Sequence, residues 1–171
     1  MKPSKDNKNK LIISLGDPAG IGTEITLKAL GSKFLNKNIQ PIVVGCKNNI
    51  LKTYFKLIDH GIKDIPHPDN IDIIDIPLEY NAIPGIVDKN TGSASFKWLV
   101  NATNILLDRK ANALVTAPIS KIAWHQAGHE FAGQTELLGK LTNKKTSMLF
   151  TAVSPNNGWR FNTLLATTHI P

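Results

Sequence analysis

Short apolar runs rich in β-branched residues alternate along the chain with longer stretches in which apolar residues recur every three or four positions. The short runs predict strands and the longer stretches predict helices, because side chains repeat every two residues in a strand and every 3.6 in a helix. The predicted strands are Leu11–Leu15, Pro41–Val44, Ile71–Ile76, Ala113–Thr116, Ser147–Ala152 and Thr163–Thr167. The predicted helices are Ile21–Leu30, Asn48–Ile58, Ser93–Arg109, Ser120–Ala127 and Thr135–Leu141.

This alternation of strand and helix predicts an α/β fold, with a mostly parallel sheet and helices on both of its faces. The longest helical pattern, residues 93–109, places a continuous apolar stripe on one face. Gly31 follows Leu30 directly and marks an expected helix end. Four prolines between Gly61 and Gly92 predict irregular connections around a single strand.

The two ends of the chain suggest how it is organised. Residues 1–10 are polar and basic and predict a disordered tail, and residues 11–171 are long enough for one domain with a core. The chain stops just after the strand Thr163–Thr167 and a polar Thr-Thr-His turn. Because the carboxyl edge of a sheet is where α/β proteins build their sites, we expect 11–171 to be the amino-terminal portion of a two-domain protein.

Composition narrows the classes of function. The chain is 42% hydrophobic and 19% charged, and no apolar run approaches the length of a membrane span. The single cysteine, Cys46, and the lack of a secretory signal fit the cytoplasm. Of 20 basic residues only Arg109 and Arg160 are arginine, so the net charge of +7 favours an anionic small molecule over nucleic acid.

The first candidate segment runs from a strand through a glycine-rich turn into a helix, at Ser14–Glu24. Gly16, Gly20 and Gly22 permit close backbone approach, and the helix amino terminus can bind an anion. The segment is neither a P-loop nor the usual dinucleotide fingerprint, since Ile25 stands where a further glycine is needed. Taken alone, it is explained by a tight strand-to-helix turn.

The second segment, Ala113–Lys121, ends an apolar strand at Thr116 and opens a helix with Ser120 and Lys121. This geometry carries a hydroxyl and an ammonium from the carboxyl end of a strand toward a crevice. Lys121 would bind a carboxylate or phosphate there as a point charge. A solvated surface lysine is the alternative.

Two further segments carry polar residues at element boundaries. Gln134 and Thr135 stand at a helix start, where Thr135 could be no more than a cap, and His169 follows the buried strand Thr163–Thr167. A single histidine makes no metal site by itself. His125 and His129 are four residues apart, but the expected helix end between them argues against a shared metal.

The order and spacing of these segments resemble the 4-hydroxythreonine-4-phosphate dehydrogenase family, from about Leu11 to the end of the chain. The family's Gly-Glu/Asp-Pro-Ala-Gly-Ile-Gly turn is matched by Gly16–Gly22, and its Thr-Ala-Pro-Ile-Asn/Ser-Lys segment by Thr116–Lys121. Its Phe-x-Gly-His-Thr-Glu segment is matched by Phe131–Glu136, and its Thr-Thr-His-x-Pro segment by Thr167–Pro171. Four ordered motifs are far more specific than any one of them.

The resemblance implies the fold of the isocitrate and isopropylmalate dehydrogenases, with two α/β domains around a cleft and a homodimer as the working form. It implies oxidation and decarboxylation of 4-phosphooxy-L-threonine to 3-amino-2-oxopropyl phosphate in vitamin B6 synthesis. The implied cofactors are NAD, with NADP also possible, and a divalent metal, which could be zinc, magnesium, manganese or cobalt.

The resemblance also assigns roles to individual residues. His169 matches a metal ligand, Gln134 and Thr135 match residues that bind the phosphorylated substrate, and Lys121 is the catalytic candidate. Gly16, Gly20 and Gly22 are the candidates for the cofactor. Gln134 departs from the family's histidine, and an amide can donate a hydrogen bond but carries no charge.

The family's proteins are much longer than this chain, and their other two metal-binding histidines follow the point where it stops. We therefore expect the chain to be inactive as it stands. Two alternatives stay open. The departure at Gln134 suggests a dehydrogenase of a related four-carbon sugar-acid phosphate, and the isolated half could be a non-catalytic phosphate-binding module.

Overall fold

The computed structural model describes residues 9–166, and the chain divides into two compact units, Met1–Phe131 and Ala132–Pro171. The first unit is built on a four-stranded sheet in the order β3-β2-β1-β4. The strands are β1 (Asn9–Ser14), β2 (Ile39–Gly45), β3 (Asp72–Asp75) and β4 (Ala113–Thr116), and all of their pairings are parallel. β1 begins at Asn9, so the last two residues of the expected tail belong to the sheet.

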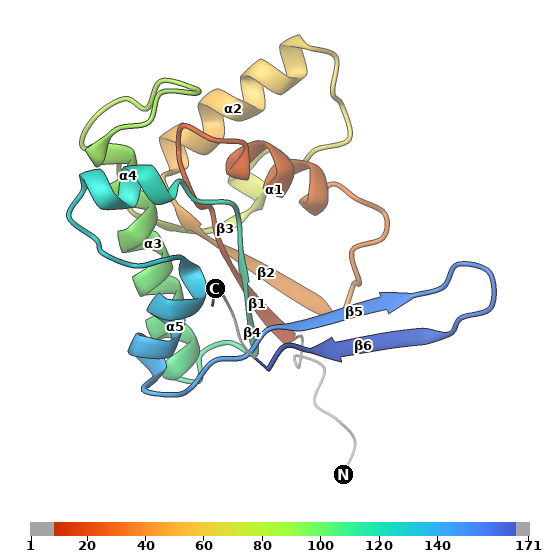
Figure 1. The fold of residues 1–171 in the computed structure, drawn as a ribbon. Helices are drawn as coiled ribbons and strands as arrows, with labels where there is room; N and C mark the ends of the chain where they lie inside the picture. Colours follow the sequence, from red (N-terminus) through yellow and green to blue (C-terminus); the bar gives the residue numbers. More distant parts are fainter. Residues whose placement is uncertain (1–8, 167–171) are drawn as a thin grey trace. The chain divides into compact units, whose positions relative to one another are not determined.

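Helices cover both faces of this sheet, as predicted (Figure 1). They are α1 (Gly22–Leu30), α2 (Lys47–Asp59), α3 (Lys89–Leu107) and α4 (Lys121–Gln126), with a short 3₁₀ turn at Pro68–Asn70. The chain moves outward from β1 to β2 and β3 and then returns to pair β4 with the opposite edge of β1. Because parallel crossovers are right-handed, this reversal places α1 and α2 on one face and α3 on the other.

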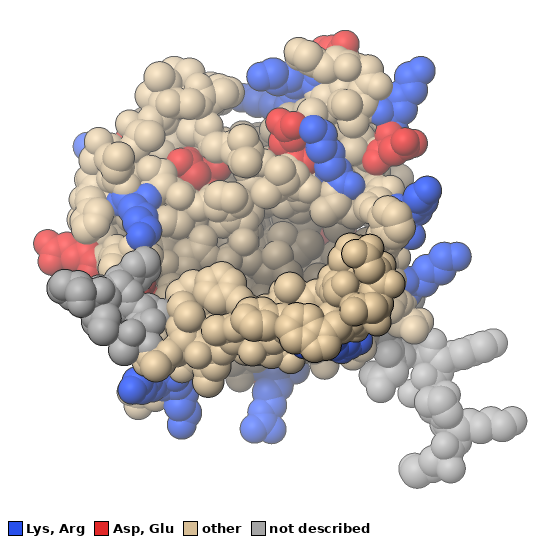
Figure 2. Space-filling view, turned by 45° about the vertical axis from the view of Figure 1, so that its right-hand side comes forward, with Lys and Arg blue, Asp and Glu red and all other residues tan. Residues whose placement is uncertain are grey.

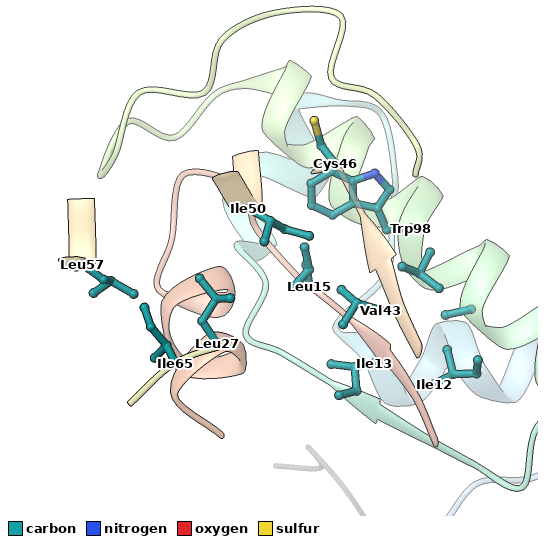
Figure 3. Packing of buried hydrophobic residues seen from close by; sticks show 12 residues of the cluster. Ile12, Ile13, Leu15, Leu27, Val43, Cys46, Ile50, Leu57, Ile65 and Trp98 are labelled. Carbon is teal, nitrogen blue, oxygen red and sulfur yellow. The ribbon is translucent and has the colours of Figure 1, made fainter. Parts of the chain in front are cut away.

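Alternate residues of the central strands fill two apolar layers (Figure 3). Ile13 and Leu15 point toward the side of α1 and α2, where they meet Leu27 and Ile50. Ile12 points the other way, toward α3, whose Trp98 is fully buried and donates its indole N–H to the carbonyl of Ile76 at 3.1 Å. The central strands are therefore buried on both faces, which is why they read as continuous apolar runs.

Capping residues fix where the helices of this unit begin and end. The carboxylate of Asp88 accepts hydrogen bonds from the backbone N–H groups of Asn90 at 2.6 Å and Thr91 at 3.0 Å. That cap starts α3 at Lys89, four residues before the predicted start at Ser93. Gly31 ends α1, as predicted.

The second unit differs from the prediction. It contains α5 (Gln134–Thr142) and the strands β5 (Leu149–Val153) and β6 (Arg160–Leu164), which pair antiparallel in a sheet of their own. The sequence suggested that Thr163–Thr167 was a buried strand of the parallel sheet, and this was wrong. The connection over residues 154–159 is too short for a parallel crossover, and both strands are largely exposed.

Close packing between α3 and α4 gives a direct test of the first unit. A Cβ atom added at Gly92 would lie 2.0 Å from the carbonyl oxygen of Ala123. Gly92→Ala should therefore lower the free energy of unfolding by about 1–3 kcal/mol, although alanine is the better helix former. Urea denaturation followed by tryptophan fluorescence measures the change.

Gly20→Ala is the matched control, because a Cβ atom there meets nothing closer than 3.4 Å. That variant should unfold within about 0.5 kcal/mol of the parent protein. A Gly92→Ala protein as stable as the parent would show that α3 and α4 do not pack this closely.

Candidate functional site

The glycine-rich turn after β1 and the loop after β4 meet at the carboxyl edge of the sheet. The backbone N–H of Ala117 donates to the carbonyl of Ser14, and that of Asp17 donates to the carbonyl of Pro118, both at 2.9 Å. β1 and β4 are the neighbouring strands at which the chain reverses its direction across the sheet, and the carboxyl edge between them is called the switch point below. Crevices at such a reversal are where open α/β sheets bind ligands. The structure thus brings the first two sequence motifs together.

The three glycines of the turn have different surroundings. Gly16 has a φ of +71°, and a Cβ atom there would lie 2.1 Å from the carbonyl oxygen of Pro118. At Gly22 it would lie 2.0 Å from the carbonyl oxygen of Leu15. Both positions are buried against protein backbone, so packing alone explains their need for glycine. Gly20 is exposed, and a Cβ atom there would make only ordinary contacts, with Asp17 at 3.4 Å or more.

A buried carboxylate that the sequence motifs did not single out lies in the same turn. Asp17 is only 7% exposed, and its Oδ1 accepts a hydrogen bond from the backbone N–H of Ala19 at 2.9 Å. Burial raises the pKa of Asp17, and the nearby charge of Asp88 adds to this rise. Hydrogen bonds from the Ala19 N–H and the Thr91 hydroxyl lower the pKa and only partly offset the burial.

The loop after β4 presents the basic group of the site. The Oγ of Ser120 accepts a hydrogen bond from the backbone N–H of Ala123 at 3.2 Å and caps α4, as the predicted helix start implied. Lys121 follows as the first helical residue and is exposed. Among the described residues its ammonium takes part in no ion pair. The helix that follows the β4 loop thus opens with an exposed ammonium that has no ion-pair partner in residues 9–166 and that an anionic group can reach.

The remaining candidates lie elsewhere in the chain. Gln134 and Thr135 are the first two residues of α5 in the second unit. The N-cap there is Gly133, so Thr135 is not the cap that its position suggested. The carbonyl of Thr135 accepts a hydrogen bond from the hydroxyl of Thr146 at 3.3 Å. His169, the metal-ligand candidate, lies outside the described residues.

The histidine pair four residues apart does not form a metal site. α4 ends at Gln126, and Gly128, with a φ of +82°, turns the chain before His129. The ring of His129 stacks on that of Phe96 with centroids 3.6 Å apart and an angle of 6° between the planes. Burial lowers the pKa of His129, which favours the neutral form of its ring. Within residues 9–166, no group of three histidine, cysteine or acidic side chains is placed to hold a metal.

Charged side chains are spread over the face of the molecule that Figure 2 shows. On the face shown in Figure 2, lysine and arginine side chains are separated by uncharged surface and by acidic side chains. None of the helices in the described part of the chain combines the length and the apolar character that a bilayer span requires.

The family profile and the similar sequences found among known proteins point to the same family. The sequence profile described as "Pyridoxal phosphate biosynthetic protein PdxA" matches residues 37–171. A 4-hydroxythreonine-4-phosphate dehydrogenase of Synechococcus sp. (strain RCC307) is 50% identical over 163 residues, which are 95% of this chain and 49% of that protein. A D-threonate 4-phosphate dehydrogenase of Pectobacterium atrosepticum is 38% identical over 146 residues, 79% of this chain and 44% of that protein.

Solved structures agree with these sequence matches. A 4-hydroxythreonine-4-phosphate dehydrogenase from Klebsiella pneumoniae superposes with a TM-score of 0.75 at 30% identity, covering 98% of this chain and 52% of the other. An enzyme of the same name from Burkholderia phymatum gives a TM-score of 0.78 at 25% identity, covering 95% and 51%. The chain therefore has the isocitrate dehydrogenase-like fold of these neighbours and spans about half the length of the curated relatives it matches.

The raised pKa of Asp17 predicts how stability depends on pH. The carboxyl group of Asp17 binds its proton more tightly in the folded chain than in the unfolded chain, where its pKa is the ordinary 3.8. The free energy of unfolding therefore falls as the pH rises from 3.8 toward the pKa of the folded state. Asp17→Asn removes the buried charge and keeps the acceptor for Ala19, so it should be more stable than the parent at neutral pH. Urea denaturation across the pH range should show this advantage disappearing below pH 3.8.

Asp17→Ala is the companion variant. It leaves the buried N–H of Ala19 without its acceptor and should be less stable than Asp17→Asn by about 1–3 kcal/mol at every pH. An Asp17→Asn protein less stable than the parent at neutral pH would contradict a destabilising charge at this position.

Proposed function

The chain belongs to the family of the pyridoxal phosphate biosynthetic protein PdxA, and we propose that it serves the oxidation and decarboxylation of 4-phosphooxy-L-threonine to 3-amino-2-oxopropyl phosphate. The observation that supports this proposal most strongly is the 50% identity over 163 residues to a 4-hydroxythreonine-4-phosphate dehydrogenase. The matched region includes the turn and the loop that meet at the switch point. The reaction belongs to vitamin B6 synthesis, and the proposed working form is a cytoplasmic homodimer.

Lys121 has the clearest part in this proposal. Its exposed ammonium, free of ion pairs with other described residues, would attract the phosphate or carboxylate of the substrate to the carboxyl edge of the sheet. The hydroxyl of Ser120 is engaged as the cap of α4, so its contribution is to hold Lys121 in place. The phosphate would be bound further by Gln134 and Thr135, as the family motif implies.

The proposal of a nicotinamide cofactor and a divalent metal rests on family membership alone. A nicotinamide, NAD or NADP, would accept the hydride, and a divalent metal would stabilise negative charge on the oxygen of the oxidised hydroxyl. The described residues supply no set of three metal ligands, and His169 is the single candidate carried over from the family. Gly20 is the candidate for a cofactor contact, because Gly16 and Gly22 lie against protein backbone.

A second substrate is favoured by two observations. Gln134 stands where the family motif has histidine, and one relative at 38% identity is named a D-threonate 4-phosphate dehydrogenase. D-threonate 4-phosphate carries a hydroxyl where 4-phosphooxy-L-threonine carries an amino group. The two substrates share the phosphate and the carboxylate, so the same switch-point cation would serve both.

Removing the charge of Lys121 tests the assignment of the site. In the protein made from the complete coding sequence, Lys121→Gln should lower kcat/KM for 4-phosphooxy-L-threonine roughly 10- to 100-fold, the effect of losing one hydrogen bond to a charged group. Reduction of NAD, followed at 340 nm, measures the loss.

Lys37→Gln is the matched control, because Lys37 is exposed and lies on the loop between α1 and β2. It should leave kcat/KM unchanged. Unaltered kinetics in Lys121→Gln would remove Lys121 from the site. Phosphate binding without any NAD reduction would instead favour a non-catalytic phosphate-binding module.

The residue at position 134 tests the choice of substrate. Gln134→His restores a group that can carry positive charge, so the variant should bind phosphorylated substrates more tightly as the pH falls below about 6.5. Measuring kcat/KM for 4-phosphooxy-L-threonine and for D-threonate 4-phosphate in parent and variant decides between the two. A parent enzyme with a strong preference for phosphothreonine would rule out the sugar-acid alternative.

A further inference from the structure

Three aromatic rings contact Phe96 of α3 where the first unit ends. The ring of His129 lies flat on that of Phe96, with centroids 3.6 Å apart. Trp124 of α4 meets Phe96 edge to face at 5.3 Å, and Phe131 lies tilted against it at 5.8 Å. Trp124 is fully buried and donates its indole N–H to the hydroxyl of Ser95 at 2.8 Å. The rings of Phe96 and Trp124 are therefore fixed in the core, and those of His129 and Phe131 pack onto them.

Residues 128–131 connect α4 to the second unit. The backbone N–H of His129 donates to the carbonyl of Trp124 at 2.9 Å, and that of Phe131 donates to the carbonyl of His129 at 3.1 Å. Gly128 has a φ of +82°, and a Cβ atom there would meet nothing within 4 Å. Phe131 is the last residue of the first unit, and α5 begins three residues later, at Gln134. The stack on Phe96 thus holds the end of the first unit just before the chain passes into the second.

No carboxylate within residues 9–166 forms an ion pair with His129. Its ring is half-buried, and burial is the one cause that shifts its pKa, which it lowers. A protonated ring in the stack would therefore lose water without gaining an opposite charge. The charged or titratable side chains of the elements packed around the ring, none of which shifts the pKa of His129, are Asp88, Lys89 and Lys97 at or on α3, Lys121 and His125 on α4, and the adjacent Glu130.

We propose that the stack of His129 on Phe96 is a pH-dependent latch on the segment 128–131. The neutral ring holds this segment against α3, and the protonated ring leaves Phe96 for solvent and frees the segment. The latch is complete above pH 6.5 and weakens as the pH falls below that value, because the stacked ring binds a proton less tightly than a free one.

Release of the latch has a consequence for the second unit. The freed segment leads directly into α5, where Gln134 and Thr135 are the proposed contacts of the substrate phosphate. Their position would then be less defined at acidic pH, which weakens substrate binding. This consequence rests on the proposed function, whereas the latch itself does not.

Hydrogen exchange tests the latch in the protein made from the complete coding sequence, without substrate. The backbone amides of His129 and Phe131, corrected for the intrinsic effect of pH, should exchange severalfold faster at about pH 5.5 than at about pH 7.5. The gain is at most about tenfold, because about pH 5.5 lies one unit below the ordinary pKa of 6.5. Exchange in β1 should not rise with it. Exchange that does not depend on pH, or that rises equally in β1, would overturn the proposal.

Two variants separate the two rings of the stack. His129→Phe keeps a flat ring on Phe96 that cannot be protonated, so the faster exchange at acidic pH should be lost. Phe96→Leu removes the stack, and NMR titration should show the pKa of His129 rising from its lowered value toward 6.5.

Two results of these measurements would contradict the latch. A pKa of His129 above 6.5 in the parent protein would mean that the face of Phe96 attracts the charged ring more strongly than burial opposes it. Faster exchange at acidic pH that persists in His129→Phe would assign the effect to another group. Neither measurement involves substrate, so the latch and the dehydrogenase activity can fail independently.

Discussion

Two loops of the parallel sheet touch backbone to backbone at the switch point, and the candidate site depends on that contact. The carbonyl of Pro118 accepts the N–H of Asp17, and no side chain fits between Gly16 and this carbonyl. The loop that makes this contact leads directly into α4, whose first residue is Lys121. It also buries the carboxylate of Asp17 beside the amino terminus of α3. The candidate site is thus held together by main-chain atoms, which leaves side chains such as that of Lys121 unengaged by this contact.

Much of this arrangement follows from local sequence. The apolar runs that predicted β1 and β2 are buried toward their carboxyl ends, whereas β3 and β4, at the two edges of the sheet, are largely exposed. The short length and β-branched residues of these runs indicate strands rather than helices. β4 was predicted with its exact bounds, since Asn112 and Pro118 lie close on either side of it. Ser120 was expected at a helix start, and the structure uses its hydroxyl as the cap. The bounds of a helix or strand can be predicted from the sequence where the residue that starts or ends it lies within a few residues of it.

Other features depend on contacts that are distant in sequence. β5 (Leu149–Val153) has the apolar composition of a core strand, and only its pairing partner distinguishes a strand of an antiparallel hairpin from a strand of the parallel sheet. The burial of Asp17 depends on α3, more than seventy residues away, so its place in the motif gave no sign of a raised pKa. The stack of His129 on Phe96 has the same origin, because the segment around His129 does not show alone which ring it will meet.

The pairing of β1 with β4 has a consequence for the order in which the chain folds. Lys10 and Asn112, which meet at the start of this pair, are 102 residues apart. During synthesis β1 can join β2 soon after Gly45 is made, but its other edge stays unpaired until β4 has left the ribosome. At about 5–20 residues per second that interval lasts several seconds. Until β4 pairs with it, β1 therefore keeps one open edge in the nascent chain.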